Sequence, residues 1–443
     1  MPRSSPSVTD PTVAEPLAID GGPKAFAHQT GKCQPKVGVA EFFAIAERFG
    51  FNDQALQRLR DAVSDADLTS CSGPHLGRYY GSASPSMGQR WEALACRHLR
   101  VKHAYAVANG TCGLTAAVAA IGAGPQHEVI IPATGFIATA LAAAALRATP
   151  VFCDIDESMQ MDPSRIEALI TDRTIAIMPT HHWGYVADMD PIMAIARRQH
   201  LRVIEDCAQS PGATYHGQSV GTIGDIGCFS ISSYKLIGGG EGGLVVTHDD
   251  RLFDRIRQAA EAGGLWRDVR FAAPRYEGEL FPGGNYRMSE LESAVNVVQI
   301  QKLPEVVARC RRVFRRFTSQ LADYREITWQ KSNDPDGDVG YMLRFFPAND
   351  ALGAKIAQAL VAEGLSAGYQ GGQAANPDWH CCKYFFPLFA DPRVRQSAEA
   401  CTTAADLYNR CLRVSVDQWW SDADCDAAAR AVNKVLSAFC TPA

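Results

Sequence analysis

The sequence has no run of about 18 uninterrupted apolar residues, the length that a membrane-spanning helix needs. Its N-terminus also lacks the charged-then-apolar order of a signal peptide. We therefore expect a cytoplasmic protein. Positive charge is not in excess either, because 43 Lys and Arg stand against 48 Asp and Glu, for a formal net charge of -5. This balance argues against a nucleic acid or an anionic membrane as partner.

Metal-binding cysteine patterns are missing as well. The 14 cysteines are scattered, with no CxxC pair and no Cys/His cluster at zinc-ligand spacing. In a reducing compartment such cysteines are free and mostly buried thiols. We therefore predict no metal site.

What the sequence does contain is an alternation of apolar strands and helices in a chain of 443 residues that is 47% hydrophobic. Helical patterns follow the first two strands and recur near 163–171 and 188–199. This alternation predicts an α/β protein with a mainly parallel sheet covered on both faces, which binds ligands beyond the carboxyl ends of its strands. The predicted strands are HAYAV, EVIIPA, PVFCDID, TIAIMPT, LRVIEDC, GCFSISS and GGLVVT.

Composition and periodicity divide the chain into three parts. Residues 1–40 form an N-terminal tail and arm that begins with a segment rich in Pro, Ser and Thr. Residues 41–305 form a large domain that contains the alternating strands and helices. Residues 306–443 form a smaller α+β domain, which a long amphipathic helix opens at roughly residue 305.

A glycine-rich stretch, FSISSYKLIGGGEGG, surrounds Lys235. Three of its glycines satisfy G-x-G-x-x-G, but they precede a strand, whereas a dinucleotide fingerprint follows a strand and opens a helix. The G-K-[ST] of a P-loop is also absent. The glycines instead supply a backbone that can pass close to a bound group.

Asp206 ends a nearly all-apolar strand, where an ionised carboxylate is costly unless it meets a positive partner. Pyridoxal 5'-phosphate would fit a carboxylate, a lysine later in the chain and a glycine-rich segment close to the bound group. Asp206 would keep the ring nitrogen of this cofactor protonated, and Lys235 would hold its aldehyde. The junction ANGTCGL would place Gly110, Thr111 and Cys112 at a helix N-terminus, which favours a phosphate. Taken one at a time, Lys235 could be an ordinary surface lysine and the other residues could be ordinary helix caps. Their placement at the ends of successive strands favours a shared cofactor site.

Three stretches carry a family resemblance: NGT, IEDCAQSPGATYHGQSVGTIGDIGCFSISSYKLIGGGEGGLVVT and GGNYRMSE. They resemble the sugar aminotransferases of the DegT/DnrJ/StrS family, with similarity from about Arg78 to Gln301 and a weaker one to the C-terminus. The resemblance implies the aspartate-aminotransferase type I fold, with pyridoxal 5'-phosphate in the large domain and a smaller α+β C-terminal domain.

The resemblance also implies roles for single residues. Lys235 would form the Schiff base with the cofactor and move the proton, and Asp206 would pair with the pyridinium. Asn285 would reach the phosphate from a second subunit, which makes the protein a homodimer with shared active sites. The remaining implied contacts are Gln209 at the phenolic oxygen, Phe136 on the ring, and Gly110, Thr111, Cys112 and Ser230 at the phosphate.

For the reaction, the resemblance implies transfer of an amino group from glutamate or glutamine to a keto-sugar or keto-cyclitol, in amino-sugar, surface-polysaccharide or antibiotic biosynthesis. LAIDGGPKA resembles cyclitol aminotransferases and 3-amino-5-hydroxybenzoate synthase. DPDGDVGYMLRFF and NPDWHCCKYFF instead resemble members that aminate an eight-carbon 3-deoxy sugar acid. The substrate contacts that we expect are Tyr80, His182, Trp183 and His380, although the His-His-Trp triplet fits a packed strand end equally well.

Two alternatives stay open at this point. A dehydratase or aromatising enzyme of the same fold is one, but dehydratase members carry a histidine in the lysine's place, and Lys235 argues against them. A regulator that binds the cofactor without catalysis is the other, and the presence of both Asp206 and Lys235 argues against it.

Overall fold

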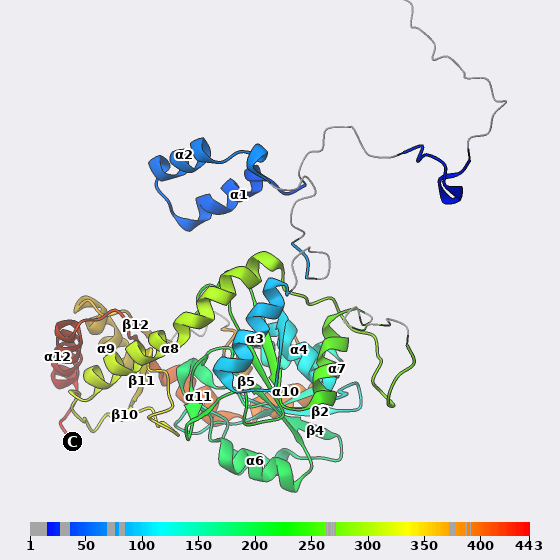
Figure 1. Cartoon of the computed structure of the whole chain (residues 1–443). Coiled ribbons are helices and arrows are strands. Elements are labelled where there is room, and N and C mark those ends of the chain that lie inside the picture. The colour runs from blue at the N-terminus through cyan, green and yellow to red at the C-terminus, as the bar shows by residue number, and fades with distance from the viewer. Residues whose placement is uncertain are drawn as a thin grey trace, which may run out of the picture. The chain divides into compact units, whose positions relative to one another are not determined.

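The computed structural model describes residues 16–26, 36–68, 76–78, 85–262, 264, 267, 269, 272–371, 378–385, 388–389 and 391–443. Tyr80, one of the expected substrate contacts, lies outside these residues. The chain divides into two compact units, Met1–His75 and Leu76–Ala443 (Figure 1). We refer to them as the N-terminal unit and the main unit.

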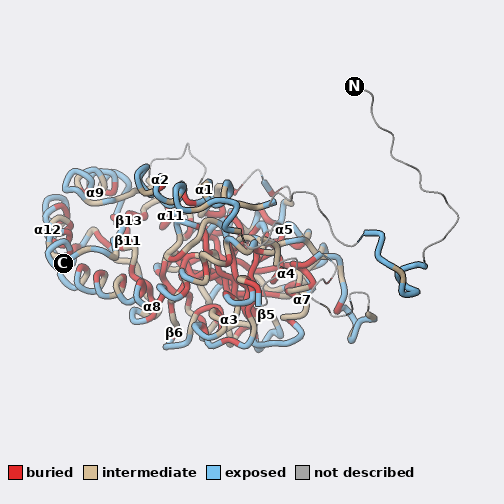
Figure 2. The backbone as a smooth tube through the Cα atoms, turned by 45° about the horizontal axis from the view of Figure 1, so that its top comes forward, coloured by how far each residue is buried: buried red, intermediate tan, exposed pale blue. Residues whose placement is uncertain are grey.

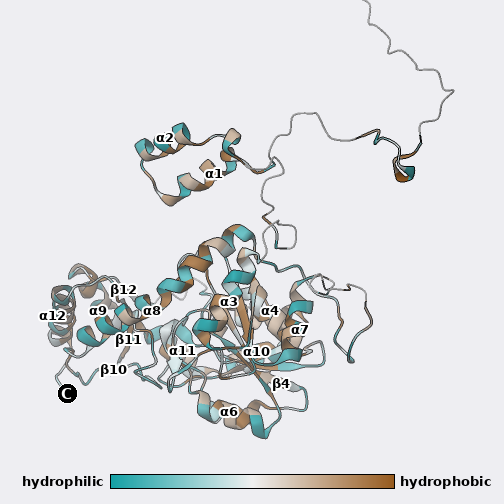
Figure 3. Cartoon of the chain, viewed as in Figure 1, coloured by the Kyte–Doolittle hydropathy of each residue, from teal (hydrophilic) through white to brown (hydrophobic). Residues whose placement is uncertain are grey.

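The N-terminal unit contains two short helices, α1 (Val39–Ala46) and α2 (Asp53–Ala62), and the 3-10 turns η1 (Ala18–Asp20), η2 (Glu47–Phe49) and η3 (Asp65–Asp67). The Asn52 side chain caps α2 by accepting from the Ala55 amide at 2.9 Å. Both helices carry hydrophilic and hydrophobic residues (Figure 3). Ala46 and Leu56 are its buried apolar side chains among the described residues, which is a very small core.

A seven-stranded sheet in the order β1-β9-β8-β5-β4-β2-β3 forms the centre of the main unit. β9 runs antiparallel to β1 and β8, and the other neighbouring pairs are parallel. Most residues of these strands are buried, and buried residues concentrate in the middle of the main unit (Figure 2). The predicted strands and the mainly parallel sheet are therefore confirmed. The bounds are β1 (His103–Val107), β2 (Glu128–Pro132), β3 (Thr149–Cys153), β4 (Thr174–Ile177), β5 (Arg202–Asp206), β8 (Ile226–Ser230) and β9 (Gly243–Thr247), with a separate hairpin of β6 (Thr214–Tyr215) and β7 (Gln218–Ser219).

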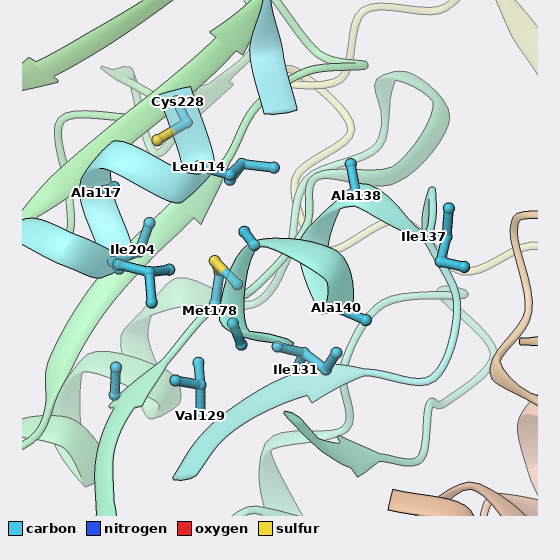
Figure 4. Packing of buried hydrophobic residues seen from close by; sticks show 14 of the residues in the cluster. Leu114, Ala117, Val129, Ile131, Ile137, Ala138, Ala140, Met178, Ile204 and Cys228 are labelled. Carbon is cyan, nitrogen blue, oxygen red and sulfur yellow. The ribbon is translucent and has the colours of Figure 1, made fainter. Parts of the chain in front are cut away.

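Helices cover both faces of this sheet. One apolar core joins it to α4 (Gly110–Ala120), α5 (Ala138–Ala145) and α7 (Asp250–Ala260), and the other joins it to α3 (Met87–Leu99) and α6 (Met189–Arg198). The small alanines of α5 let it pack closely near Ile131 and Met178 (Figure 4).

The prediction of a helix near 163–171 is wrong. That segment forms only the 3-10 turns η4 (Pro163–Arg165) and η5 (Glu167–Leu169). The Asp162 carboxylate accepts from the Ser164 amide at 2.9 Å and starts the first turn, and Ile170 is already extended, so the chain has no room for a longer helix.

The C-terminal part has its own four-stranded antiparallel sheet, in the order β10-β11-β13-β12. Its strands are β10 (Ile327–Trp329), β11 (Met342–Pro347), β12 (Ala367–Tyr369) and β13 (Leu412–Ser415). A third core packs this sheet against α9 (Asp350–Ala362), α12 (Asp422–Phe439) and the end of α8 (Glu290–Thr318). In contrast, η7 (Cys382–Tyr384), α10 (Pro392–Glu399) and α11 (Thr402–Arg410) contribute to the first core of the large sheet.

The long helix α8 begins at Glu290 rather than near residue 305, because the Ser289 hydroxyl caps it by accepting from the Glu292 amide at 3.2 Å. Pro304 lies inside the helix without ending it. The predicted domain boundaries at 40 and 305 fall within α1 and α8, and the three-part division stays a prediction. Among the described residues, none of the helices is long and apolar enough to cross a membrane.

Candidate active site

Most of the predicted site residues line one cavity of about 420 Å³ at the carboxyl end of β5 and β8, which we call the Asp206 cavity. A neighbouring cavity of about 470 Å³, the Trp183 cavity, shares Gln209, Lys235 and His380 with it. The predicted residues in the Asp206 cavity are Gly110, Thr111, Phe136, Asp206, Gln209, Ser230, Lys235 and His380.

Asp206 ends β5 and is 3% exposed. Its Oδ2 accepts from the Thr139 hydroxyl at 2.7 Å, and its Oδ1 accepts from the Ala208 amide at 3.1 Å. Burial raises the pKa of Asp206, while these two bonds and the charge of Lys235 act in the opposite direction. The carboxylate is therefore fixed in place and needs a positive partner from inside the cavity. Sequence reasoning missed Thr139, which lies in an alanine-rich helix and belongs to none of the motifs.

Lys235 lies on the loop that leads from β8 back to β9. The loop is tight, because the Ser233 amide donates to Gly240 O at 2.9 Å, and a Cβ at Gly238 would collide with Ser232 O. Burial lowers the pKa of Lys235, and the charge of Asp206 partly offsets that effect. Within the described residues, the Lys235 ammonium makes no hydrogen bond or ion pair, so its amine is free to react.

The opposite end of the Asp206 cavity is built by the start of α4. Gly110 and Thr111 line the cavity, and their amides have no partner within the described part of the chain. Ser230 lies beside them, so close that a Cβ at Gly110 would be 2.9 Å from the Ser230 Cβ. Free amides at a helix N-terminus, next to a hydroxyl, suit an anion.

The assignment of Cys112 to the phosphate stays a prediction, and the structure places this residue differently from Gly110 and Thr111. The Cys112 amide donates at 2.8 Å to Oδ1 of Asn109, which caps α4, and Cys112 does not line the cavity. Asparagine is a favoured capping residue whose side chain satisfies one free helix amide. The Asn109 side chain therefore occupies the Cys112 amide that we expected to bind the phosphate.

Of the His181-His182-Trp183 triplet, Trp183 lines the Trp183 cavity, and the two histidines line neither of the two cavities described. Its backbone is left-handed, with φ of 55°, and its amide donates to the Gln209 Oε1 at 3.0 Å. His182 is fully buried behind Trp183, and neither of its ring nitrogens has a hydrogen-bond partner. Burial and the nearby Arg344 charge hold the pKa of His182 well below its usual value, so the ring is neutral.

His380 lines both cavities, and its Nδ1 lies 2.9 Å from Oδ1 of Asp378. Burial alone would raise the pKa of Asp378, but the bonds from His380 lower it to about 2. The ionised Asp378 carboxylate thus fixes the orientation of the His380 ring at the junction of the two cavities.

Behind Asp206, three possible metal ligands lie within 4.8 Å of one another: His181, Glu205 and Cys207. The Ala187 amide donates to the His181 Nδ1 at 3.1 Å, so Nε2 carries the proton and donates to Glu205 at 3.1 Å. This carboxylate is already bonded, and the group is a hydrogen-bonded support for the end of β5. The amides that donate to Glu205 belong to Gly221, Ile223 and Gly224.

Asn285 is exposed and lines neither cavity of its own chain. Its assignment to the phosphate of a second subunit stays a prediction. The lining residues that were not predicted as contacts include Glu241 and Thr180, whose buried hydroxyl has no partner among the described residues.

The Asp206 cavity fits pyridoxal 5'-phosphate in three respects. A fixed, buried carboxylate faces the cavity where a ring nitrogen would need a counter-charge. An amine without a partner, that of Lys235, lines the same cavity. Free amides beside the Ser230 hydroxyl offer donors to a phosphate, and Phe136 adds an aromatic face.

Comparison with known proteins agrees with this geometry. GDP-perosamine synthase of Caulobacter vibrioides is 41% identical over 223 residues, which cover 50% of this chain but only 58% of that relative. L-glutamine:2-deoxy-scyllo-inosose aminotransferase of Streptomyces paromomycinus is 33% identical over 316 residues, 69% of this chain and 73% of the relative. The crystal structure of an aminotransferase from Psychrobacter cryohalolentis superposes with a TM-score of 0.70 and 27% identity, over 80% of this chain and 92% of that one.

The family model of the DegT/DnrJ/EryC1/StrS aminotransferases matches residues 84–433, so the N-terminal unit lies outside the match. The fold class and the family resemblance that the sequence predicted are both confirmed. The chain belongs to the DegT/DnrJ/EryC1/StrS aminotransferase family.

Proposed function

We propose that this chain is an aminotransferase that uses pyridoxal 5'-phosphate to transfer an amino group from glutamate or glutamine to the carbonyl group of a sugar or cyclitol. The observation that carries the proposal is the placement of Lys235 and Asp206 on the wall of one cavity of about 420 Å³. The names of a GDP-perosamine synthase and of a 2-deoxy-scyllo-inosose aminotransferase among the relatives support both the reaction and the substrate class.

The chain's own residues divide the work. The cofactor, when bound, supplies an aldehyde that takes up the amino group and a ring that draws electrons from the reacting carbon. Asp206, held by Thr139, would keep the ring nitrogen of the bound cofactor protonated. Lys235, whose pKa burial lowers, would offer its Nζ as the base that moves the proton. The phosphate would be held by Gly110, Thr111 and Ser230.

The Trp183 cavity is the space for the acceptor. Aromatic rings of Trp183 and Tyr341 and polar groups of Gln209 and Ser415 line it. Aromatic faces pack against the C–H groups of a sugar or cyclitol ring, while polar groups bond its hydroxyls. Trp183 and His380 are thus the proposed substrate contacts, and buried His182 supports Trp183 from behind.

We further propose a homodimer in which Asn285 completes the phosphate site of the other subunit. The side chain is exposed, and a bridge between Glu261 and Asn285 fixes its backbone. A cytoplasmic location is supported by the cysteines of the described residues, which are all free thiols.

A single half-reaction tests the proposal. Enzyme loaded with pyridoxal 5'-phosphate and mixed with glutamate or glutamine alone should change its absorption to that of the amine form and release one 2-oxo acid per site. Lys235→Ala should lose this reaction. Lys102→Ala, which removes an exposed lysine 2.7 Å from Asp250, should keep it. A Lys235→Ala enzyme with full activity would refute the proposal, and release of water from substrate without a donor would indicate a dehydratase.

A further inference from the structure

A third cavity lies outside the active site, between the second half of α8 and the C-terminal sheet. Its volume is about 280 Å³, slightly below the range of sites for drug-sized ligands, so it suits a molecule with a single ring. It shares no lining residue with the Asp206 cavity or the Trp183 cavity. We call it the α8 cavity. Its lining residues come mainly from α8, from β10 and β11, and from the loop between these two strands.

Part of the wall of the α8 cavity is apolar. Two aromatic and three aliphatic side chains line it: Phe314, Trp329, Leu321, Pro335 and Leu343. Aromatic faces of this kind pack well against a flat ring. A ring with many hydroxyl groups would leave some of them without partners on such a wall, which is costly. We therefore expect the body of a ligand in this cavity to be an aromatic ring.

Arg311 of α8 brings a positive charge to the same cavity. Its Nε donates to Asp338 O at 2.8 Å, and its Nη2 donates to Gly337 O at 2.7 Å. Both acceptors are uncharged carbonyl groups, and within the described residues the Nη1 makes no hydrogen bond and the side chain makes no ion pair. Burial and the charge of Arg315 lower the pKa of Arg311, as expected for a guanidinium group without an adjacent anion. An anion in the cavity would supply this missing partner.

The two carboxyl groups on the wall do not neutralise this charge. The Asp338 carboxyl group accepts from the Val186 amide at 2.9 Å and from the Ser332 hydroxyl at 2.5 Å. Burial raises the pKa of Asp338 to about 7, which reduces its negative charge further. The carboxylate of Asp323 is exposed and accepts from the Trp329 Nε1 at 3.0 Å. The cavity therefore keeps an excess of positive charge.

Arg344 lies between the α8 cavity and the Trp183 cavity. Its guanidinium carbon is 5.1 Å from the ring centroid of Tyr185, which lines the α8 cavity, and 4.5 Å from that of Trp183, which lines the substrate space. Arg344 is fully buried, and its Nε and Nη1 have no partner among the described residues. Its charge therefore adds to the positive potential of the α8 cavity, and its position links the two cavities.

We propose that the α8 cavity is a regulatory site that binds a small aromatic carboxylate. The carboxylate would bond the Arg311 guanidinium group, and the ring would pack against Phe314 and Trp329. Because Arg344 contacts one ring on the wall of each cavity, an anion in the α8 cavity would act through it on Trp183 and change the affinity for substrate. The regulatory effect rests on the proposed function, whereas the binding site does not.

Calorimetry with benzoate and the cofactor-loaded protein tests the site without turnover. Benzamide, the uncharged analogue, should bind at least about 10-fold more weakly than benzoate does. Arg311→Met should weaken benzoate binding by about 10- to 150-fold, as expected for the loss of charge-assisted hydrogen bonds. Arg312→Met is the matched control, because the neighbouring Arg312 side chain is 55% exposed and pairs with Asp422 on the surface. This control should bind benzoate like the wild type, and denaturant unfolding checks that each variant is folded.

Leu321→Trp is a second test, which fills the α8 cavity and removes no charge. It should also weaken benzoate binding at least about 10-fold. In the wild type, saturating benzoate should change the glutamate or glutamine concentration that gives the half-maximal rate of the half-reaction by at least about fivefold. In Leu321→Trp this concentration should not respond to benzoate.

The outcomes separate the site, its regulatory role and the proposed function. Absence of benzoate binding, or binding that Arg311→Met and Leu321→Trp both leave unchanged, overturns the site. Binding that both variants lose, without any effect on the half-reaction of the wild type, keeps the site and overturns its regulatory role. The same binding in a wild type that transfers no amino group keeps the site and refutes the proposed function.

Discussion

Replacing Thr139 by Val removes one hydroxyl behind Asp206 and keeps the branched shape of the side chain. The hydroxyl is 2.7 Å from the Asp206 Oδ2, and both residues are 3% exposed. Its longer approach to Phe136 O, at 3.2 Å, competes weakly with a bond to a carboxylate. A hydrogen bond to a charged group contributes about 1.5–3 kcal/mol. Its loss disfavours the ionised carboxylate and therefore raises the pKa of Asp206 further.

Asp206 in the variant should ionise less readily, and the ring nitrogen needs the ionised form as its partner. We therefore expect the dissociation constant of pyridoxal 5'-phosphate to rise, by at most about 150-fold if the full 3 kcal/mol acts on binding. Titration of the cofactor-free protein, followed by quenching of tryptophan fluorescence, measures this constant. Thr139→Ser keeps the hydroxyl and should bind the cofactor nearly as well as the wild type.

Thr247→Val is the control for loss of a buried hydroxyl elsewhere. Thr247 is 2% exposed and donates to Asp225 O at 2.7 Å, at the end of β9 away from Gly243. This variant should lower stability but leave cofactor affinity unchanged. If Thr139→Val binds the cofactor as tightly as the wild type does, the hydroxyl does not control Asp206 and the reasoning is refuted.

Three further predictions concern charge and assembly. In the cofactor-free protein, Lys235 should become reactive toward an amine reagent at a pH below 10.5, because burial lowers its pKa. Asp206→Asn removes a negative charge that raises the Lys235 pKa, so this reactive pH should be lower still in the variant. A higher reactive pH in the variant would contradict the assigned role of the Asp206 charge. Burial raises the pKa of Asp338 from 3.8 to about 7, so the stability that this group contributes is lost as the pH rises. Between pH 5 and 6.5, the free energy of unfolding of the wild type should fall by about 1.4 kcal/mol per pH unit relative to Asp338→Asn, as measured by denaturant unfolding. A difference that does not change with pH would contradict burial of the carboxyl group. Asn285→Ala should weaken cofactor retention in the dimer, measured by dialysis, and equal retention would mean that the partner subunit does not complete the phosphate site.

The sequence predicts the sheet well, and Asp206 and Lys235 line one cavity as the sequence leads us to expect, for a physical reason. Buried parallel strands need nearly continuous apolar runs, and their carboxyl ends meet at one edge, so Asp206 and Ser230 are brought together by the topology alone. Lys235 is recognisable because the surrounding glycines have no other evident purpose. The loop confirms their role, since no side chain fits at Gly238.

The parts that the sequence does not reveal depend on contacts between distant segments or on local competition for donors. Thr139 reaches Asp206 only because α5 packs beside β5. The Cys112 amide donates to the Asn109 side chain, a local capping bond that is one of several conformations the sequence allows. The α8 cavity brings together residues as distant in the chain as Tyr185 and Arg344.

The central claim is that Lys235 is the amine that meets the cofactor's aldehyde opposite Asp206. Borohydride reduction of the protein loaded with pyridoxal 5'-phosphate, followed by peptide mapping by mass spectrometry, tests it most directly. We expect one pyridoxyl group per chain, on the Nζ of Lys235, and none in Lys235→Ala. A pyridoxyl group on a different lysine, or a wild-type protein that reduction leaves unlabelled, would contradict the claim.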